Sequence, residues 1–125
     1  MVLVDTSVWV AHLREGNVGL EELLNEGQTA CHPFIIGELA CGNLKNRSLI
    51  LSLLKSLPAA TVAEHDEVMH FIENKNLMGR GLGYVDMHLL ASASLSGVPV
   101  WTLDQKLDSS SEKLGLKYFF SKRQV

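Results

Sequence analysis

The chain has 125 residues, of which 46% are hydrophobic, and its formal net charge is −3 at pH 7. This size predicts one globular domain over residues 1–125 that can bury a core without disulfides. Its apolar stretches are shorter than the roughly 18 residues of a membrane-spanning helix, and no basic secretory signal is visible at the N-terminus. We therefore expect a cytoplasmic protein with no membrane partner, in which Cys31 and Cys41 are buried thiols.

The charges are unevenly distributed. Residues 1–73 carry four basic and ten acidic side chains, whereas residues 74–125 carry seven basic and four acidic ones. The negative balance argues against a nucleic-acid partner, but bound divalent cations would invert the local field. Charge alone therefore does not exclude a polyanionic substrate.

Hydrophobic periodicity predicts short strands that alternate with helices. In chain order, the predicted elements are a strand at 2–5, a helix at 7–13, a helix around Leu20, Leu23 and Leu24 that ends near Gly27, a strand at 29–31, a helix beginning near Pro33, a helix at 47–57, a strand at 60–63, a helix at 64–77, a glycine-rich loop at 79–83, a helix at 84–96, a strand at 99–103, a helix at 106–114 and a strand at 116–119. Thr6 or Ser7 is expected to cap the first helix, and Gly97 to end the helix at 84–96. This alternation predicts an α/β fold, a three-layer α/β/α sandwich with a short, mainly parallel central sheet.

Four acidic residues lie beside apolar segments, where folding alone does not readily explain a carboxylate. They are Asp5, Glu38, Asp86 and Asp104, which we call the acidic quartet. A charged carboxylate next to core residues is unfavourable unless it is paired or binds a metal. Asp5 ends one predicted strand and Asp104 follows another, at the sheet edge where open α/β folds bind ligands. The pattern predicts an acidic, metal-dependent active site.

Each acid also has a simpler interpretation. Asp5 can cap the first helix, Asp86 can favour a helix dipole, and Asp104 can begin a turn. Glu38 can be a partly exposed residue at a helix edge, and Asp108 is expected to be solvated. Gathered together, however, like charges about 4 Å apart repel by roughly 4 kcal/mol at an effective dielectric constant of 20. A set of oxygen ligands without His or Cys partners favours Mg²⁺ or Mn²⁺, which activate water against phosphodiesters.

Other polar features give weaker predictions. The histidines form no zinc signature, and His88 is expected at the surface because helical spacing turns it away from Asp86. The loop at 79–83 lacks the strand that a dinucleotide-binding fingerprint requires. Its Arg80 is a candidate RNA phosphate contact, together with Lys106 and Lys113 beyond Asp104.

Five segments carry a resemblance to a known family. They are Val2-Leu3-Val4-Asp5-Thr6-Ser7-Val8-Trp9, Ile36-Gly37-Glu38-Leu39, Gly81-Leu82-Gly83-Tyr84-Val85-Asp86, Leu90-Ala91-Ser92-Ala93 and Trp101-Thr102-Leu103-Asp104. In this order and spacing they resemble the PIN-domain ribonucleases, and among these the VapC toxins of bacterial toxin–antitoxin pairs. The similarity extends from Val2 to about Phe119.

The resemblance implies a PIN-like fold in which Asp5, Glu38 and Asp86 bind the metal and Asp104 completes the set. It favours Asp104 over Asp108 and implies that Thr6, Ser7 and Thr102 support the site. It further implies a Mg²⁺- or Mn²⁺-dependent endoribonuclease that cleaves cellular RNA such as tRNA, a cognate antitoxin and a homodimer. Part of the apolar surface offered by Trp9, Leu13, Leu20, Leu23 and Leu24 would then meet the antitoxin or the second subunit.

Two alternatives remain open from the residues. A phosphoaspartyl enzyme or receiver-like domain also gathers acids around Mg²⁺ at strand ends, but it uses one aspartate as a phosphate acceptor. A catalytically inactive binding module of the same fold would act only through its partner. Cleavage of RNA with and without EDTA separates both alternatives from a nuclease.

Overall fold

The structure, a computed structural model, describes residues 1–120; residues 121–125, including Lys122 and Arg123 of the basic half, lie outside the described residues. Within the described part, one sheet contains β1 (Val2–Val4), β2 (Thr29–Ala30) and β3 (Val100–Trp101) in the order β2-β1-β3. All pairs are parallel, with Leu3 opposite both Ala30 and Val100. The chain leaves β1 toward β2 on one side and later returns to β3 on the other. The carboxyl end of β1 therefore lies at a topological switch point.

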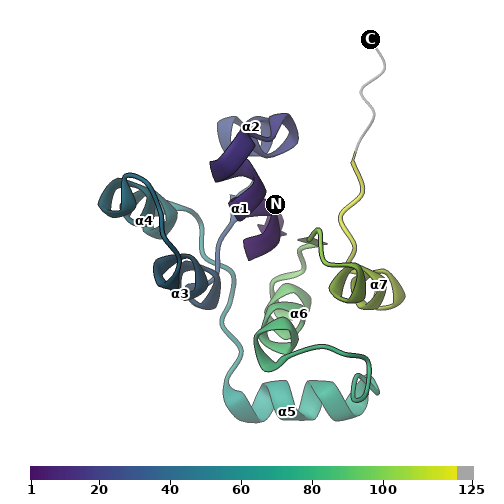
Figure 1. The fold of residues 1–125 in the computed structure, drawn as a ribbon. Coiled ribbons are helices and arrows are strands. Elements are labelled where there is room, and N and C mark those ends of the chain that lie inside the picture. Colours follow the sequence, from purple (N-terminus) through teal and green to yellow (C-terminus); the bar gives the residue numbers. More distant parts are fainter. Residues whose placement is uncertain (121–125) are drawn as a thin grey trace.

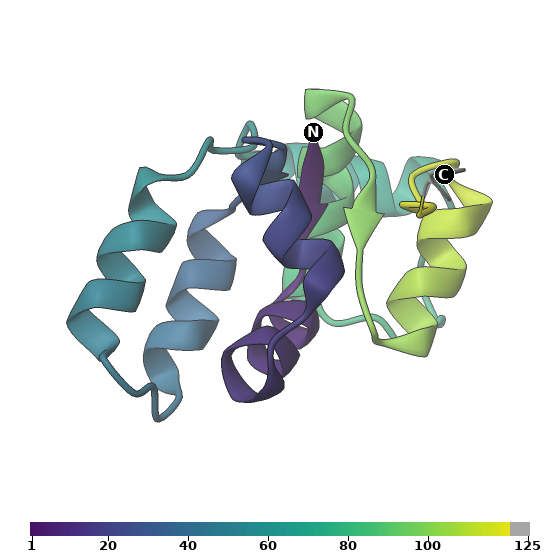
Figure 2. The ribbon, with the colours of Figure 1, turned by 90° about the horizontal axis from the view of Figure 1, so that it is seen from above.

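Helices cover both faces of this sheet. They are α1 (Thr6–Glu15), α2 (Val18–Asn25), α3 (Pro33–Cys41), α4 (Arg47–Ser56), α5 (His65–Asn74), α6 (Tyr84–Ser96) and α7 (Gln105–Lys113). Figures 1 and 2 show α1 and α2 over one face, α6 backed by α5 on the other, the α3–α4 hairpin at one edge and α7 at the opposite edge. The predicted α/β fold with a short parallel sheet is confirmed. No helix in the described residues is both long and apolar enough to cross a membrane.

Two predicted strands are wrong. Neither 60–63 nor 116–119 forms a strand; each vicinity contributes one isolated parallel bridge, Cys31 to Ala59 and Val100 to Lys117. After Ala60 the backbone is bound by side chains of helix α6. The Thr61 amide donates a hydrogen bond to Ser96 Oγ at 2.8 Å, and the Ala63 amide donates one to Ser92 Oγ at 3.4 Å. The backbone donors that a strand would use are therefore bound by helix side chains.

The helix ends follow local chemistry, with one exception. Pro33 occupies the first turn of α3, and Gly97 ends α6 in the left-handed conformation with φ of 67°, as predicted. At α1, neither Thr6 nor Ser7 is the cap: Asp5 holds the N-cap position and makes no side-chain capping bond. The hydroxyls of Thr6 and Ser7 bind carboxylates instead.

Tertiary packing overturns two further predictions. His88 is only 4% exposed, and its ring lies 4.5 Å from the Phe34 ring and 4.7 Å from the Tyr84 ring, centroid to centroid. It is buried because α6 runs through the interior, so spacing relative to Asp86 says little about exposure. Cys41 is exposed at the end of α3, whereas Cys31 is buried as expected.

The apolar residues of α1 and α2 are divided between core and surface. Trp9, Leu20 and Leu23 are buried, and Leu24 packs against the core. Leu13 remains 36% exposed. Most of the apolar surface that the sequence offers here is therefore used within the domain.

Candidate active site

Asp5 is the most enclosed member of the acidic quartet. It directly follows the central strand β1 and is 7% exposed. Its Oδ2 accepts hydrogen bonds from Ser7 Oγ at 2.8 Å and Thr102 Oγ1 at 2.7 Å. The helix-capping interpretation fails for this carboxylate, because both bonds come from side-chain hydroxyls.

The two hydroxyls around Asp5 have matching roles. Ser7 Oγ accepts a bond from the Leu103 amide at 2.9 Å, and Thr102 Oγ1 accepts one from the Asp104 amide at 3.0 Å. Since each hydroxyl has a single proton, which it can donate to Asp5, the 3.2 Å contact between the two oxygens needs no hydrogen bond of its own. The network ties the end of β1 to the segment that follows β3.

Glu38 reaches the same edge from α3. Its side chain is exposed, in agreement with the interpretation of Glu38 as a residue at a helix edge. Glu38 Oε1 accepts a hydrogen bond from Thr6 Oγ1 at 2.7 Å, which joins α3 to the first residue of α1. A hydroxyl–carboxylate bond of this length is a strong one.

Asp86 lies in the first turn of α6 and is partly buried. The Gly83 amide donates to Asp86 Oδ2 at 3.0 Å, so the helix-end interpretation holds for one of its oxygens. Burial raises the pKa of Asp86, as do the negative charges of Asp5, Asp104 and Glu38, while the Gly83 amide opposes the rise. The three other carboxylates are thus close enough to repel it.

Asp104 caps α7, with Oδ1 accepting from the Leu107 amide at 2.9 Å. Its carboxylate is exposed, so the simpler interpretation is also correct for one of its oxygens. Asp108 instead forms an ion pair with Lys117, with Oδ2 and Nζ 2.9 Å apart. The negative charges that raise the pKa of Asp86 include that of Asp104 and not that of Asp108.

All four carboxylates share one arrangement. Each uses one oxygen in the hydrogen bonds described above, and within residues 1–120 the other oxygen accepts none; the free atoms are Asp5 Oδ1, Glu38 Oε2, Asp86 Oδ1 and Asp104 Oδ2. Anchoring one oxygen orients the carboxylate and leaves the other for a ligand. As they stand, no three His, Cys, Asp or Glu side chains in the described part converge closely enough to hold an ion. The set fits a hard divalent cation by its oxygen chemistry, and closure would require the repelling side chains to move together.

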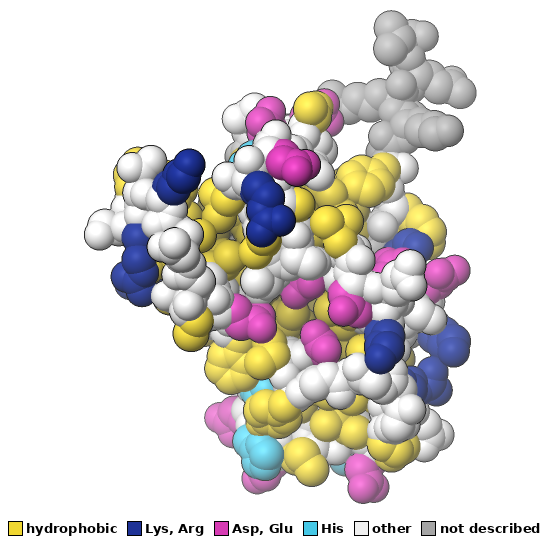
Figure 3. Space-filling view, viewed as in Figure 1, with side chains coloured by type: hydrophobic (Ala, Val, Ile, Leu, Met, Phe, Trp, Pro, Cys, Tyr) yellow, Lys and Arg dark blue, Asp and Glu magenta, His cyan; other side chains and the backbone are white. Residues whose placement is uncertain are grey.

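Figure 3, viewed as Figure 1, shows acidic side chains gathered near the centre of one face, with Lys and Arg side chains beside them toward α7. The sequence analysis predicted the acids and the hydroxyls of this site. It did not predict the Gly83 amide, which binds Asp86, or the amides of Leu103 and Asp104, which orient the hydroxyls. The role of Gly83 could have been predicted from its position at the start of a helix, three residues before the acidic side chain of Asp86.

Comparison with known proteins places the chain in a family. A family model described as PIN domain matches residues 2–113. The chain is 44% identical over 117 residues to Ribonuclease VapC32 of Mycobacterium tuberculosis strains CDC 1551 / Oshkosh and ATCC 25618 / H37Rv, covering 93% of this chain and 94% of each relative. A solved structure titled "Crystal Structure of PAE2754 from Pyrobaculum aerophilum" is similar in fold, with a TM-score of 0.63, 21% identity and 90% coverage of both chains. The chain belongs to the PIN-domain family, and within it to the VapC type.

Proposed function

We propose that this protein is a divalent-cation-dependent endoribonuclease and the toxin of a toxin–antitoxin pair. Its similarity to a relative named Ribonuclease VapC32 supports the activity. The observation that carries the metal dependence is the arrangement of the acidic quartet, in which each carboxylate has one anchored and one free oxygen. Asp5, Glu38, Asp86 and Asp104 are the proposed ligands.

The protein's own groups would organise the site. Ser7 and Thr102 fix Asp5 at the end of β1, and Thr6 fixes Glu38. Mg²⁺ or Mn²⁺ held by the quartet would act as a Lewis acid on the scissile phosphate and lower the pKa of the attacking water. The raised pKa of Asp86 means that the ionised quartet is unfavourable without a compensating positive charge.

The finer aspects of the proposal concern partners. The substrate is cellular RNA, with tRNA as a candidate, and the protein acts in the cytoplasm as a homodimer controlled by a cognate antitoxin. Exposed apolar side chains on α1 and α4 support the proposal that other protein chains bind this domain. They include Val10 at 38%, Leu49 at 60% and Leu53 at 55% exposure.

Three conservative variants test the activity. Asp5→Asn, Glu38→Gln and Asp86→Asn should each abolish RNA cleavage in Mg²⁺ while the far-ultraviolet circular dichroism spectrum stays that of the wild type. Asp108→Asn is the matched control, because Asp108 is paired with Lys117 and should leave cleavage nearly unchanged. Near wild-type cleavage by two of the three variants would show that the site is elsewhere.

The cleavage assay and a test for protein-bound phosphate together separate the alternatives. A nuclease loses activity in EDTA and regains it with excess Mg²⁺. Cleavage of no RNA under any divalent cation would favour the inactive binding module. Neither a nuclease nor a binding module should carry protein-bound phosphate. Phosphorylation of one aspartate that is stable in acid and removed by hydroxylamine would indicate the phosphoaspartyl alternative.

A further inference from the structure

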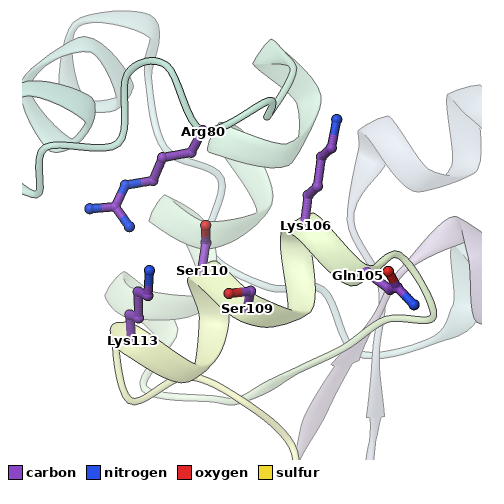
Figure 4. A pocket seen from close by; sticks show the side chains of 6 residues that line it. All are labelled: Arg80, Gln105, Lys106, Ser109, Ser110 and Lys113. Carbon is purple, nitrogen blue, oxygen red and sulfur yellow. The ribbon is translucent and has the colours of Figure 1, made fainter.

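A groove lies beside the acidic quartet, between the loop at 79–83 and one face of α7 (Figure 4). Its volume is about 250 Å³, and it is lined by Arg80, Gln105, Lys106, Ser109, Ser110 and Lys113. We call it the α7 groove. Only Arg80, Lys106 and Lys113 were singled out from the sequence; the serines and Gln105 are added by the structure.

The α7 side of the groove has a helical pattern. Lys106, Ser109, Ser110 and Lys113 stand at i, i+3, i+4 and i+7, so they share one face of the helix. Lys106 and Lys113 are separated by roughly 10 Å along the axis, from the 1.5 Å rise per residue. Figure 4 shows Arg80 reaching from the opposite loop toward Lys113, with the Ser110 side chain pointing from α7 toward Arg80. The groove therefore presents cationic groups at its ends and hydroxyl donors along its floor.

The positive charges in the groove are uncompensated. No acidic side chain lines it, and within residues 1–120 neither Arg80, Lys106 nor Lys113 forms an ion pair. The acids of α7 are engaged elsewhere, because Lys117 Nζ lies 2.9 Å from Asp108 Oδ2 and 3.7 Å from Glu112 Oε2. One face of the helix is thus neutralised while the other stays cationic.

The backbone around Arg80 is shaped to this groove. Arg80 Nε donates to the Asn76 carbonyl at 3.0 Å, which fixes the side chain, and within residues 1–120 the terminal guanidinium nitrogens make no hydrogen bond. Gly81 has φ of 75°, and a Cβ there would lie 2.8 Å from Lys106 Cδ. Glycine therefore permits both the turn and the close approach of Lys106.

The groove adjoins the quartet at two points. Asp104 caps α7, whose first residues line the groove, and Gly83, two residues after Gly81, donates to Asp86. A polyanion that extends along the groove toward the N-terminus of α7 therefore approaches Asp104. This juxtaposition explains how an acidic centre can act on a negatively charged chain.

We propose that the α7 groove binds a backbone phosphate of single-stranded RNA, on the same strand as the phosphate that is cleaved. Arg80 and Lys113 hold the phosphate by charge, Ser110 donates a hydrogen bond, and Lys106 guides the strand from the groove to Asp104. The contact is to the backbone, so it contributes affinity and register without reading base sequence. The assignment of RNA as ligand rests on the proposed function.

The test is RNA binding in Ca²⁺ at several salt concentrations, with a short fluorescent single-stranded RNA of randomised sequence as the probe. Arg80→Ala and Lys113→Ala should each weaken binding several-fold and lower the slope of log K against log salt by up to about 0.7, the value for one phosphate contact of a single strand. Lys55→Ala is the matched control: it removes the same charge from α4, at a separate cavity that contains Cys31 and His32, and should change neither quantity.

A second arm separates RNA from small anions. Neutral methylphosphonate linkages are placed one at a time along a defined RNA; one position should weaken binding to the wild type and have no further effect on Arg80→Ala. Equal losses of RNA affinity for Lys55→Ala and the groove variants would overturn the proposal. Binding of inorganic phosphate is measured in parallel. Saturable phosphate binding, together with an RNA affinity that is unchanged in Arg80→Ala, would also overturn the proposal. Cleavage of RNA by the wild type in Mg²⁺, scored separately, decides the proposed function; binding by the groove is decided by the salt slope.

Discussion

Thr102 offers a sharp test of how the quartet is held. Its hydroxyl is buried, donates to Asp5 Oδ2 at 2.7 Å and accepts from the Asp104 amide at 3.0 Å, so it links two carboxylate-bearing segments. Thr102→Val keeps the shape and removes both bonds. A hydrogen bond to a charged group contributes about 1.5–3 kcal/mol, and the Asp104 amide can regain water because Asp104 is exposed. We expect Thr102→Val to lower the free energy of unfolding by about 2–3 kcal/mol, mostly from the lost bond to Asp5.

The matched variant is Thr102→Ser, which keeps the hydroxyl and loses one methyl group, at a cost of about 1 kcal/mol. Urea unfolding in EDTA measures both variants, and cleavage in Mg²⁺ measures the effect on the site. Thr102→Val should lose most activity while Thr102→Ser retains most of it. Equal stability and activity of the two variants would refute the role given to the hydroxyl.

Three further outcomes are expected. Because the pKa of Asp86 is raised in the fold, the stability that Asp86 contributes is present at low pH and is lost as pH rises through its folded-state pKa. Asp86→Asn should therefore make the metal-free protein more stable than the wild type at neutral pH. Urea unfolding measured at neutral and at acidic pH should show that this advantage disappears in acid. Burial raises the pKa of Cys31 to about 11, so near pH 8 iodoacetamide should modify exposed Cys41 and spare Cys31, and mass spectrometry of Cys41→Ser should show almost no adduct. Asp104→Asn should impair cleavage more than Asp108→Asn, although asparagine can still cap α7; the reverse order in a cleavage assay would make Asp108 the fourth acid.

Local sequence patterns predicted much of this fold because several elements are defined by their own residues. The buried run at β1, Pro33 at the start of α3 and Gly97 at the end of α6 all act locally. The predicted strand at 60–63 failed because Ser92 and Ser96, some thirty residues later, bind its amides. No local pattern encodes such a partner.

The candidate site shows the same division. The acidic quartet was predicted from the apolar residues adjacent to each acid in the sequence. In the structure only Asp5 of the four is buried, and Glu38 and Asp104 are exposed. The hydroxyl pair around Asp5 depends on the register of β1 with β3, which brings Ser7 and Thr102 together. The burial of His88 likewise depends on the packing of α6, which helical spacing alone does not fix.

The most direct test of the central claim is a crystal structure of the protein grown with Mn²⁺, with anomalous diffraction used to locate the ion. We predict an anomalous peak in contact with the free oxygens of the acidic quartet, Asp5 Oδ1 and Asp86 Oδ1 among them, and its loss in Asp5→Asn. The same preparation should cleave RNA in Mn²⁺. An active protein whose only anomalous peak lies away from the quartet would contradict the proposed metal site.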